Sequence, residues 1–263
     1  TVSIVHAITG GGGTDITNIT ADAGSAFDVS TIATEKLNIT LEAGEDVTST
    51  NAVNAATTDI TIAGGNSLST FTFAANAIVD TVKTVDGSAF KGNVVFDVIK
   101  DVIDDTIVLT GSSVSTKDEL NYQIDATGTD KLYSTGVEIL DLNVDKTSTL
   151  DLTNAVGVTS IDIDVLDAKT ITLSNLTGAE TILITDASDD SAVTATLATA
   201  SGTSDTLTFE VKDASANIDA GVNLNTTDIE TVTIKASSDE SLDLSGLAMT
   251  TAGDVMTLTL TGD

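Results

Sequence analysis

A short run of alternating apolar residues recurs along this chain, each time directly after a glutamate. The run reads Glu-Thr-Ile-Leu-Ile at 180–184 and Glu-Thr-Val-Thr-Ile at 230–234, and looser copies begin at Glu35 and Glu138. Apolar side chains at every second position, flanked by Gly, Asn, Asp or Ser, are typical of a short strand. The repetition therefore predicts a chain of many short strands. We expect each glutamate to mark the point where a turn becomes a strand.

A second phrase, apolar-Asp-apolar-Ser/Thr, begins at Phe27, Leu150 and Leu242. In a strand, the middle aspartate points to the opposite face from its two apolar neighbours. We therefore expect Asp28 and Asp151 to face solvent while the residues on either side of them fill a core.

The predicted strands become regular after residue 136, with steps of roughly ten to twelve residues between them. Their predicted centres are Leu140, Leu150, Ile161, Ile171, Ile182, Ala195, Leu207, Ile218, Val232, Leu242 and Leu258. Such repetition predicts an all-β fold, a parallel β-helix or β-solenoid. With two or three strands per coil, one coil would hold about 20–35 residues.

Tandem β-sandwich domains are the alternative, because sandwich strands also recur every 8–12 residues or so. The chain contains no Trp and no Pro, and its phrases recur at irregular multiples of one step. A sandwich would instead repeat at a domain period of about 100 residues. These features favour the solenoid.

The regularity of the pattern divides the chain into an irregular β-solenoid part, 1–136, and a regular one, 137–263. No Gly/Ser-rich or Pro-rich linker separates them, so no firm boundary is expected. Thr116 and Glu119 have the spacing of a capping box, which predicts a short helix near 116–124. Both ends of the sequence read as strands, so we expect a fragment of a longer chain.

Acidic residues dominate the charge of the chain. It carries 40 Asp and Glu against 10 basic residues, all of them Lys, for a net charge of -30 at pH 7. Such a field repels nucleic acid and anionic membranes, and it favours screening by divalent cations. No stretch of about 18 apolar residues occurs, so we expect no insertion into a membrane. Without Cys, disulfides and thiolate metal sites are excluded.

Acidic clusters in the predicted turns are candidate calcium ligands. Calcium takes about six to eight oxygens, many of them from Asp in turns and from backbone carbonyls. Asp15 is a candidate because Gly10–Asp15 resembles the start of the Gly-Gly-x-Gly-x-Asp calcium repeat, although Thr17 stands where an apolar residue is expected. The other candidates are Asp104, Asp105, Asp186, Asp189, Asp190, Asp239 and Glu240. For each cluster, the alternative is a solvated acidic turn.

Nothing in the sequence points to a catalytic centre. His6 is the only histidine, it lies in an apolar run, and no Gly-x-Ser-x-Gly elbow accompanies it. Pairs of carboxylates could hydrolyse glycosides, but with this many Asp residues such pairs arise by chance. We expect no enzyme; a β-helix enzyme that degrades polysaccharides is the least favoured of three functional hypotheses.

Several stretches resemble the repetitive regions of bacterial S-layer proteins and of RTX-type surface adhesins exported by type I secretion. They are the phrase at Glu230, the run 84–93 and the strand 205–209, and the acidic, Cys-free, Thr-rich composition is similar too. The resemblance implies a calcium-dependent β-solenoid on the cell surface, outside the cell, with an export signal at a C-terminus beyond this sequence. Intact calcium nonapeptides are missing here, which departs from the family pattern.

The first hypothesis is therefore a structural cell-surface protein, a segment of an S-layer lattice subunit that assembles with calcium. The second is an adhesin stalk or a binding module of a secreted RTX-type protein. Under these two hypotheses the expected partners of the chain are further copies of itself, in a lattice or filament, and a cell-surface polysaccharide.

Overall fold

The regular structure of the chain consists of strands. The computed structural model describes residues 2–7, 14–21, 26–42, 44, 46–99, 107–166, 168–185, 191–199, 205–211, 223–227, 229–236, 248–250 and 257–262. In these residues every regular element is a β-strand, which confirms the all-β prediction. Correspondingly, no helix in this part of the chain has the length and apolar character needed to cross a membrane.

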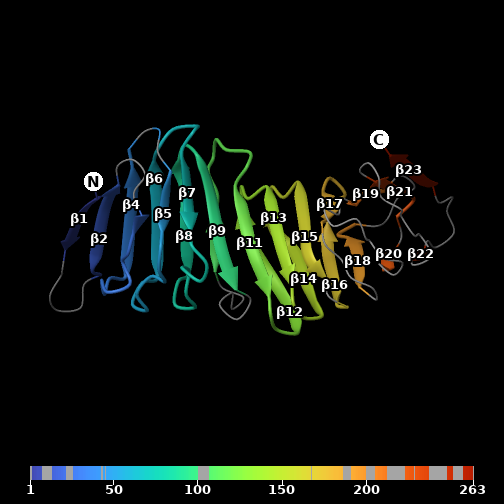
Figure 1. Cartoon of the computed structure of the whole chain (residues 1–263), viewed down its shortest axis with the longest axis horizontal. Coiled ribbons are helices and arrows are strands. Elements are labelled where there is room, and N and C mark those ends of the chain that lie inside the picture. Colours follow the sequence, from blue (N-terminus) through green and yellow to red (C-terminus); the bar gives the residue numbers. More distant parts are fainter. Residues whose placement is uncertain are drawn as a thin grey trace. The chain divides into compact units, whose positions relative to one another are not determined.

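Successive strands alternate between two sheets (Figure 1). One sheet contains β1 (Val2–Ala7), β2 (Ile16–Ala21), β4 (Lys36–Leu41), β6 (Asp59–Gly64), β8 (Thr84–Phe90), β10 (Val108–Thr110), β12 (Gly128–Thr135), β14 (Ser148–Val156), β16 (Thr170–Leu176), β18 (Ala192–Leu197), β20 (Asn223–Thr227) and β22 (Ala248–Thr250). The other contains β3 (Ala26–Phe27), β5 (Val47–Ser49), β7 (Thr70–Phe73), β9 (Asn93–Ile99), β11 (Glu119–Ile124), β13 (Ile139–Val144), β15 (Ser160–Leu166), β17 (Thr181–Ile184), β19 (Thr206–Val211), β21 (Thr231–Ala236) and β23 (Thr257–Gly262).

From β2 onward, each strand neighbours the strand two places later in the chain, and the pairing is parallel, as between β2 and β4 and between β6 and β8. Lys36 of β4 lies opposite Asp59 of β6, for example, and the pairing continues in register along both strands. Side-chain hydrogen bonds between neighbouring coils join residues 19 to 25 positions apart. The parallel pairing confirms the β-solenoid prediction, with two strands in each coil, and is not that of an antiparallel β-sandwich.

One strand departs from the parallel pattern. β1 runs antiparallel to β2, with Val2 opposite Ala21 and Ala7 opposite Ile16. It thereby covers the backbone edge of β2 that would otherwise be open to another chain.

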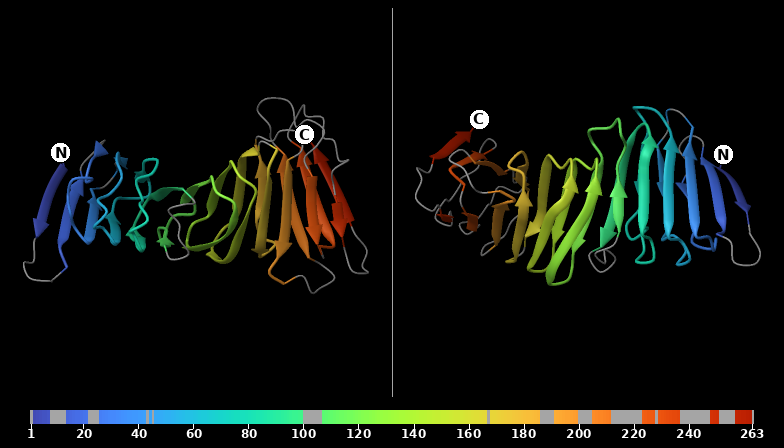
Figure 2. Two further views of the ribbon diagram at one scale, coloured as in Figure 1. Left: turned by 90° about the horizontal axis from the view of Figure 1, so that it is seen from below. Right: turned by 180° about the vertical axis from the view of Figure 1, so that it is seen from behind.

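The chain divides into two compact units. Unit 1 comprises residues 1–122, 133–138 and 155–157, and unit 2 comprises residues 123–132, 139–154 and 158–263. These bounds differ from the sequence-based division at residue 136, which rested on the regularity of the strands. Within unit 1, strands β2 to β10 lie side by side, blue to green in Figure 2.

The core of each unit is a ladder of stacked apolar side chains. In unit 1, Phe71 meets Phe73 edge to face, with ring centroids 4.9 Å apart, and Phe73 stacks on Phe96 at 6.1 Å. In unit 2 the ladder is mostly aliphatic: Leu140 lies opposite Ile161, which lies opposite Ile182, and all three are fully buried. The alternation of buried and outward residues along each strand is what the repeated phrase predicts.

The predicted strand centres after residue 136 agree with the structure wherever it is described. All of them lie in strands except Ile218 and Leu242, which fall outside the described residues. The expected solvent-facing aspartates are confirmed as well. Asp28 is exposed while Phe27 and Val29 are buried.

The predicted helix near 116–124 is wrong. Residues Glu119–Ile124 form strand β11, whose Leu120, Tyr122 and Ile124 are buried in alternation with outward-facing residues. A capping box is a local signal worth about 1 kcal/mol, and burial of three large side chains on one face of a strand outweighs it.

The stacked rings supply the first testable prediction. Replacing Phe73 by Ala leaves a cavity between Phe71 and Phe96 and should lower the free energy of unfolding by about 3–5 kcal/mol. Chemical denaturation followed by circular dichroism measures the loss. The matched control is Leu68→Ala, because Leu68 is 82% exposed and its loss should cost about 0.5 kcal/mol or less. Equal effects of the two substitutions would contradict the described core.

Candidate functional site

The glutamate of the repeated phrase accepts a hydrogen bond from backbone. Strands β4, β13, β17 and β21 each begin one residue after it, which confirms its predicted place at the turn-to-strand junction. Three of these carboxylates reach a residue one coil earlier: Glu35 accepts from the Asp15 amide at 2.7 Å, Glu138 from the Asp118 amide at 3.0 Å and Glu230 from the Asp205 amide at 2.8 Å. Each carboxylate thus ties the start of its strand to the preceding coil.

The fourth glutamate, Glu180, closes its own turn instead. Its two carboxylate oxygens accept from the amide and hydroxyl of Thr177 and from the amide of Gly178, at 2.8 to 3.1 Å. Gly178 has a φ of 85°, in the left-handed region that glycine adopts without strain. Glu180 is only 5% exposed, so its charge is held by these donors.

The aspartates of the second phrase bind one side chain in the next coil. Asp28 accepts from the Ser30 amide at 2.8 Å and from the Asn51 side chain at 2.7 Å. Asp151 repeats the arrangement, accepting from the Thr153 amide and hydroxyl and, at 2.7 Å, from Asn175. The pKa of both carboxyls lies below its ordinary value, mainly because of the hydroxyl two residues later. These aspartates therefore join neighbouring coils through a hydrogen bond from an asparagine side chain.

Of the carboxyls in the described part of the chain, that of Asp118 is the most deeply buried, with no exposed surface. Its two oxygens accept from the backbone amides of Val94 and Ser112, both at 2.6 Å. Burial away from water raises its pKa to about 6, and the nearby charge of Glu138 adds to the rise. Asp118 therefore joins neighbouring coils of unit 1 through a charge with little access to water.

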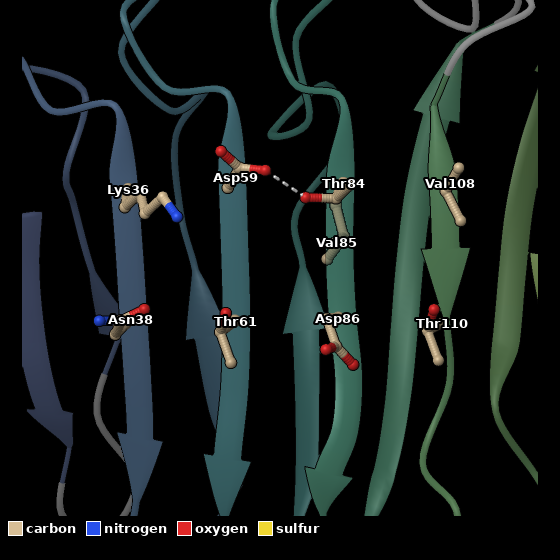
Figure 3. Close-up of a pocket in the computed structure, with 9 residues that line it drawn as sticks. All are labelled: Lys36, Asn38, Asp59, Thr61, Thr84, Val85, Asp86, Val108 and Thr110. Atoms are coloured by element: carbon tan, nitrogen blue, oxygen red, sulfur yellow. Dashed lines mark hydrogen bonds between the residues drawn. The ribbon is translucent and has the colours of Figure 1, made fainter. Parts of the chain in front are cut away.

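A shallow hollow of about 480 Å³ lies on the outer face of β4, β6, β8 and β10 in unit 1 (Figure 3). It is lined by Lys36, Asn38, Asp59, Thr61, Thr84, Val85, Asp86, Val108 and Thr110. The outward-facing residues form two rows across the strands, because the strands pair in register. It brings ammonium, carboxylate, amide and hydroxyl groups together on one surface.

Asp59 is the best-oriented group in this hollow. Its two oxygens accept from the Thr84 hydroxyl at 2.6 Å and from the Thr58 hydroxyl at 2.9 Å. The Thr84 hydroxyl chiefly holds the pKa of Asp59 below its ordinary value, and the charge of Lys36 acts in the same direction. Asp59 is therefore an ionised acceptor with a fixed direction at neutral pH.

Among the predicted calcium ligands, only Asp15 lies in the described part of the chain. Its backbone amide donates to Glu35, and its carbonyl accepts from the Thr34 hydroxyl at 2.9 Å. The others, Asp104, Asp105, Asp186, Asp189, Asp190, Asp239 and Glu240, lie outside the described residues. Within the described ranges, no three acidic or His side chains gather as one metal site. Calcium binding therefore stays a prediction.

Sequence reasoning did not find the hollow or the buried carboxyl. Asp59 and Asp86 are 27 positions apart in the sequence. The register of β6 and β8 nevertheless brings them onto one surface, because it places Thr61, two residues after Asp59, directly beside Asp86. Asp118 has one sequence signal, because it directly precedes a strand, as the glutamates do. Its partners belong to other coils and cannot be read from its neighbours in the sequence.

Comparison of the chain with protein-family models, with curated proteins and with solved structures gives no match. The features of this chain that bear on its function are the stacked coils, the carboxylates between them and the hollow on unit 1.

Asp118 gives the chain a pH-dependent contribution to stability. Its pKa of about 6 in the folded state lies above the ordinary 3.8, so the folded state binds the proton more tightly and this contribution grows as pH falls through 6. From pH 7 to pH 5, the unfolding free energy of the wild type should rise relative to that of Asp118→Asn by about 1 kcal/mol. Denaturant titrations at both pH values measure the difference. A difference that stays flat or falls would contradict this account.

The turn closed by Glu180 supplies another prediction. Glu180→Ala leaves the amides of Thr177 and Gly178 without their acceptor and should cost about 1–3 kcal/mol of unfolding free energy. Thermal unfolding monitored by circular dichroism provides the measurement. The matched control is Glu210→Ala on the outer face of β19, which should cost about 0.5 kcal/mol or less. If the two variants unfold alike, the carboxylate of Glu180 has no special part in the turn.

Proposed function

We propose that this chain is a structural segment of a cell-surface protein, part of an S-layer lattice subunit. The observation that carries the proposal is the repeated tie between consecutive coils. Parallel backbone pairing, a stacked core and the carboxylates of Glu35, Glu138 and Glu230 all join one coil to the next. A stack of this kind gains its stability from neighbouring repeats, so it extends without a separate domain core. Such a body suits a load-bearing layer outside the cell.

Charge supports the calcium part of the proposal. A net charge of -30 makes copies of the chain repel one another, so a lattice needs neutralising cations between them. Calcium would bind between acidic clusters of neighbouring copies, with the sequence clusters at Asp104–Asp105 and Asp239–Glu240, outside the described residues, as first candidates. An ion that binds only the folded, assembled state stabilises it by mass action. Export by type I secretion would then deliver the chain to calcium outside the cell.

A second candidate function is an adhesin stalk or binding module. The hollow on unit 1 favours it, because a surface with a fixed acceptor at Asp59 and several further polar groups suits a polar ligand. Lattice formation and ligand binding use different surfaces in these two proposals, so each can be tested alone.

Assembly with calcium is the test of the first function. Purified chain is expected to form ordered sheets or filaments in negative-stain electron micrographs when calcium is added, and to lose them in excess EGTA. The matched controls are magnesium at the same concentration and sodium chloride at the same ionic strength, which screen charge without the coordination that calcium prefers. Monomers in calcium would contradict the lattice role. Assemblies that survive EGTA would contradict the calcium part alone.

A further inference from the structure

We propose that the outer face of β4, β6, β8, β10 and the end of β12 that belongs to unit 1, residues 133–135, binds a neutral polysaccharide whose chain runs across the strands. The inference gives a ligand class to the second candidate function and does not depend on the lattice role. Its warrant is the order in which polar and apolar side chains follow one another across that face.

The register places two rows of outward-facing side chains across five adjacent strands. One row is Lys36, Asp59, Thr84, Val108 and Tyr133, and the other is Asn38, Thr61, Asp86, Thr110 and Thr135. Four strand spacings of about 4.8 Å make each row about 19 Å long. A row of this length matches several sugar units of an extended glycan rather than a single small molecule.

The polar end of the face suits sugar hydroxyls. A hydroxyl both donates and accepts, so it is best held by a surface that presents both kinds of group. Asp59 accepts in a direction fixed by Thr84 and Thr58, while the Lys36 ammonium in the adjacent strand only donates (Figure 3). Asn38 and Thr61, two residues after Lys36 and Asp59 on the same strands, carry groups that both donate and accept hydrogen bonds.

The other end of the face is apolar. Val108 is 42% exposed, and Tyr133 lies directly beside it in the next strand. Tyr133 is half-buried. It faces outward, because its neighbours Leu132 and Ser134 are buried and successive side chains of a strand point to opposite faces. An aromatic ring with a polar hydroxyl at its tip offers a flat surface for the C–H face of a sugar ring. The sequence does not reveal this pair, because Val108 and Tyr133 lie 25 positions apart and only the length of the coil places them side by side.

Charge selects an uncharged glycan. The two rows carry the carboxylates of Asp59 and Asp86 and the ammonium of Lys36, and Lys131 is exposed two positions before Tyr133 on β12. The chain as a whole has a net charge of -30, so an acidic polysaccharide would meet like charge at long range. The hollow of about 480 Å³ falls within the usual size range of ligand sites, about 300–1,000 Å³.

Affinity gel electrophoresis of the whole chain tests the proposal. The gels contain dextran, laminarin or galactomannan as neutral polymers, and alginate as the acidic one. We expect at least one neutral polymer to retard the chain and alginate to leave it unretarded. Retardation by alginate alone, or by no neutral polymer, would overturn the proposal.

Variants locate the binding surface. Tyr133→Ala should weaken binding of the retarding polymer by about tenfold or more, and Tyr133→Phe should recover most of it because the ring remains. Thr61→Trp fills the hollow and should weaken binding similarly. The matched control is Thr72→Trp on the outward face of β7 in the other sheet, which should bind like the wild type.

Circular dichroism of each variant confirms that it is folded. Wild-type binding by both Tyr133→Ala and Thr61→Trp would overturn the proposal. The lattice role is tested separately, because Tyr133→Ala should still assemble with calcium. Failure of the wild type to bind a neutral polymer therefore counts against the glycan proposal alone, and failure to assemble with calcium counts against the lattice proposal alone.

Discussion

Parallel pairing between consecutive coils is the constraint on which this structure depends. From β4 onward, each interior strand satisfies its backbone groups on the strands two places earlier and two places later, so every coil requires a neighbour in register. The register stacks like side chains on like, which builds the apolar ladder inside and rows of polar groups outside. Turn amides have no strand partner, and buried amides need an acceptor. The carboxylates of Glu35, Glu138 and Glu230 supply that acceptor from the next coil.

The acidic residues of this chain therefore fall into groups with different physical roles. Some are held by backbone donors at the start of strands. Asp118, the most buried of those in the described residues, has a pKa of about 6 because burial removes it from water, although its backbone donors act to lower that pKa. Others, such as Asp28 and Asp151, join coils through an asparagine and keep a lowered pKa. The net charge of -30 is the sum over all of these groups and the lysines. Only carboxylates on outer faces and turns remain to meet cations or ligands.

The same register that builds the core also arranges the candidate binding face. Asp59 gains its fixed direction from Thr84 in the adjacent strand, and Val108 gains Tyr133 as a neighbour in the next one. Neither arrangement needs a cleft between domains, because a stacked sheet presents its outward side chains in rows. The two proposed functions follow from this geometry: stacking supports a structural layer, and a row of graded polarity supports glycan binding.

What the sequence determined by itself was the class of fold and the place of most strands. Alternation of apolar residues involves only a few neighbouring positions, so a strand can be predicted from the sequence of a single coil, as at Leu140 and Ile182. The prediction failed at 116–124 because it followed the capping-box spacing of Thr116 and Glu119, whereas the alternating Leu120, Tyr122 and Ile124 are buried in strand β11. Tertiary structure alone decided which coils' side chains meet. Paired residues of neighbouring coils lie 20 to 31 positions apart, and this variation hides the Asp28–Asn51 hydrogen bond and the Val108–Tyr133 pair from any fixed sequence spacing.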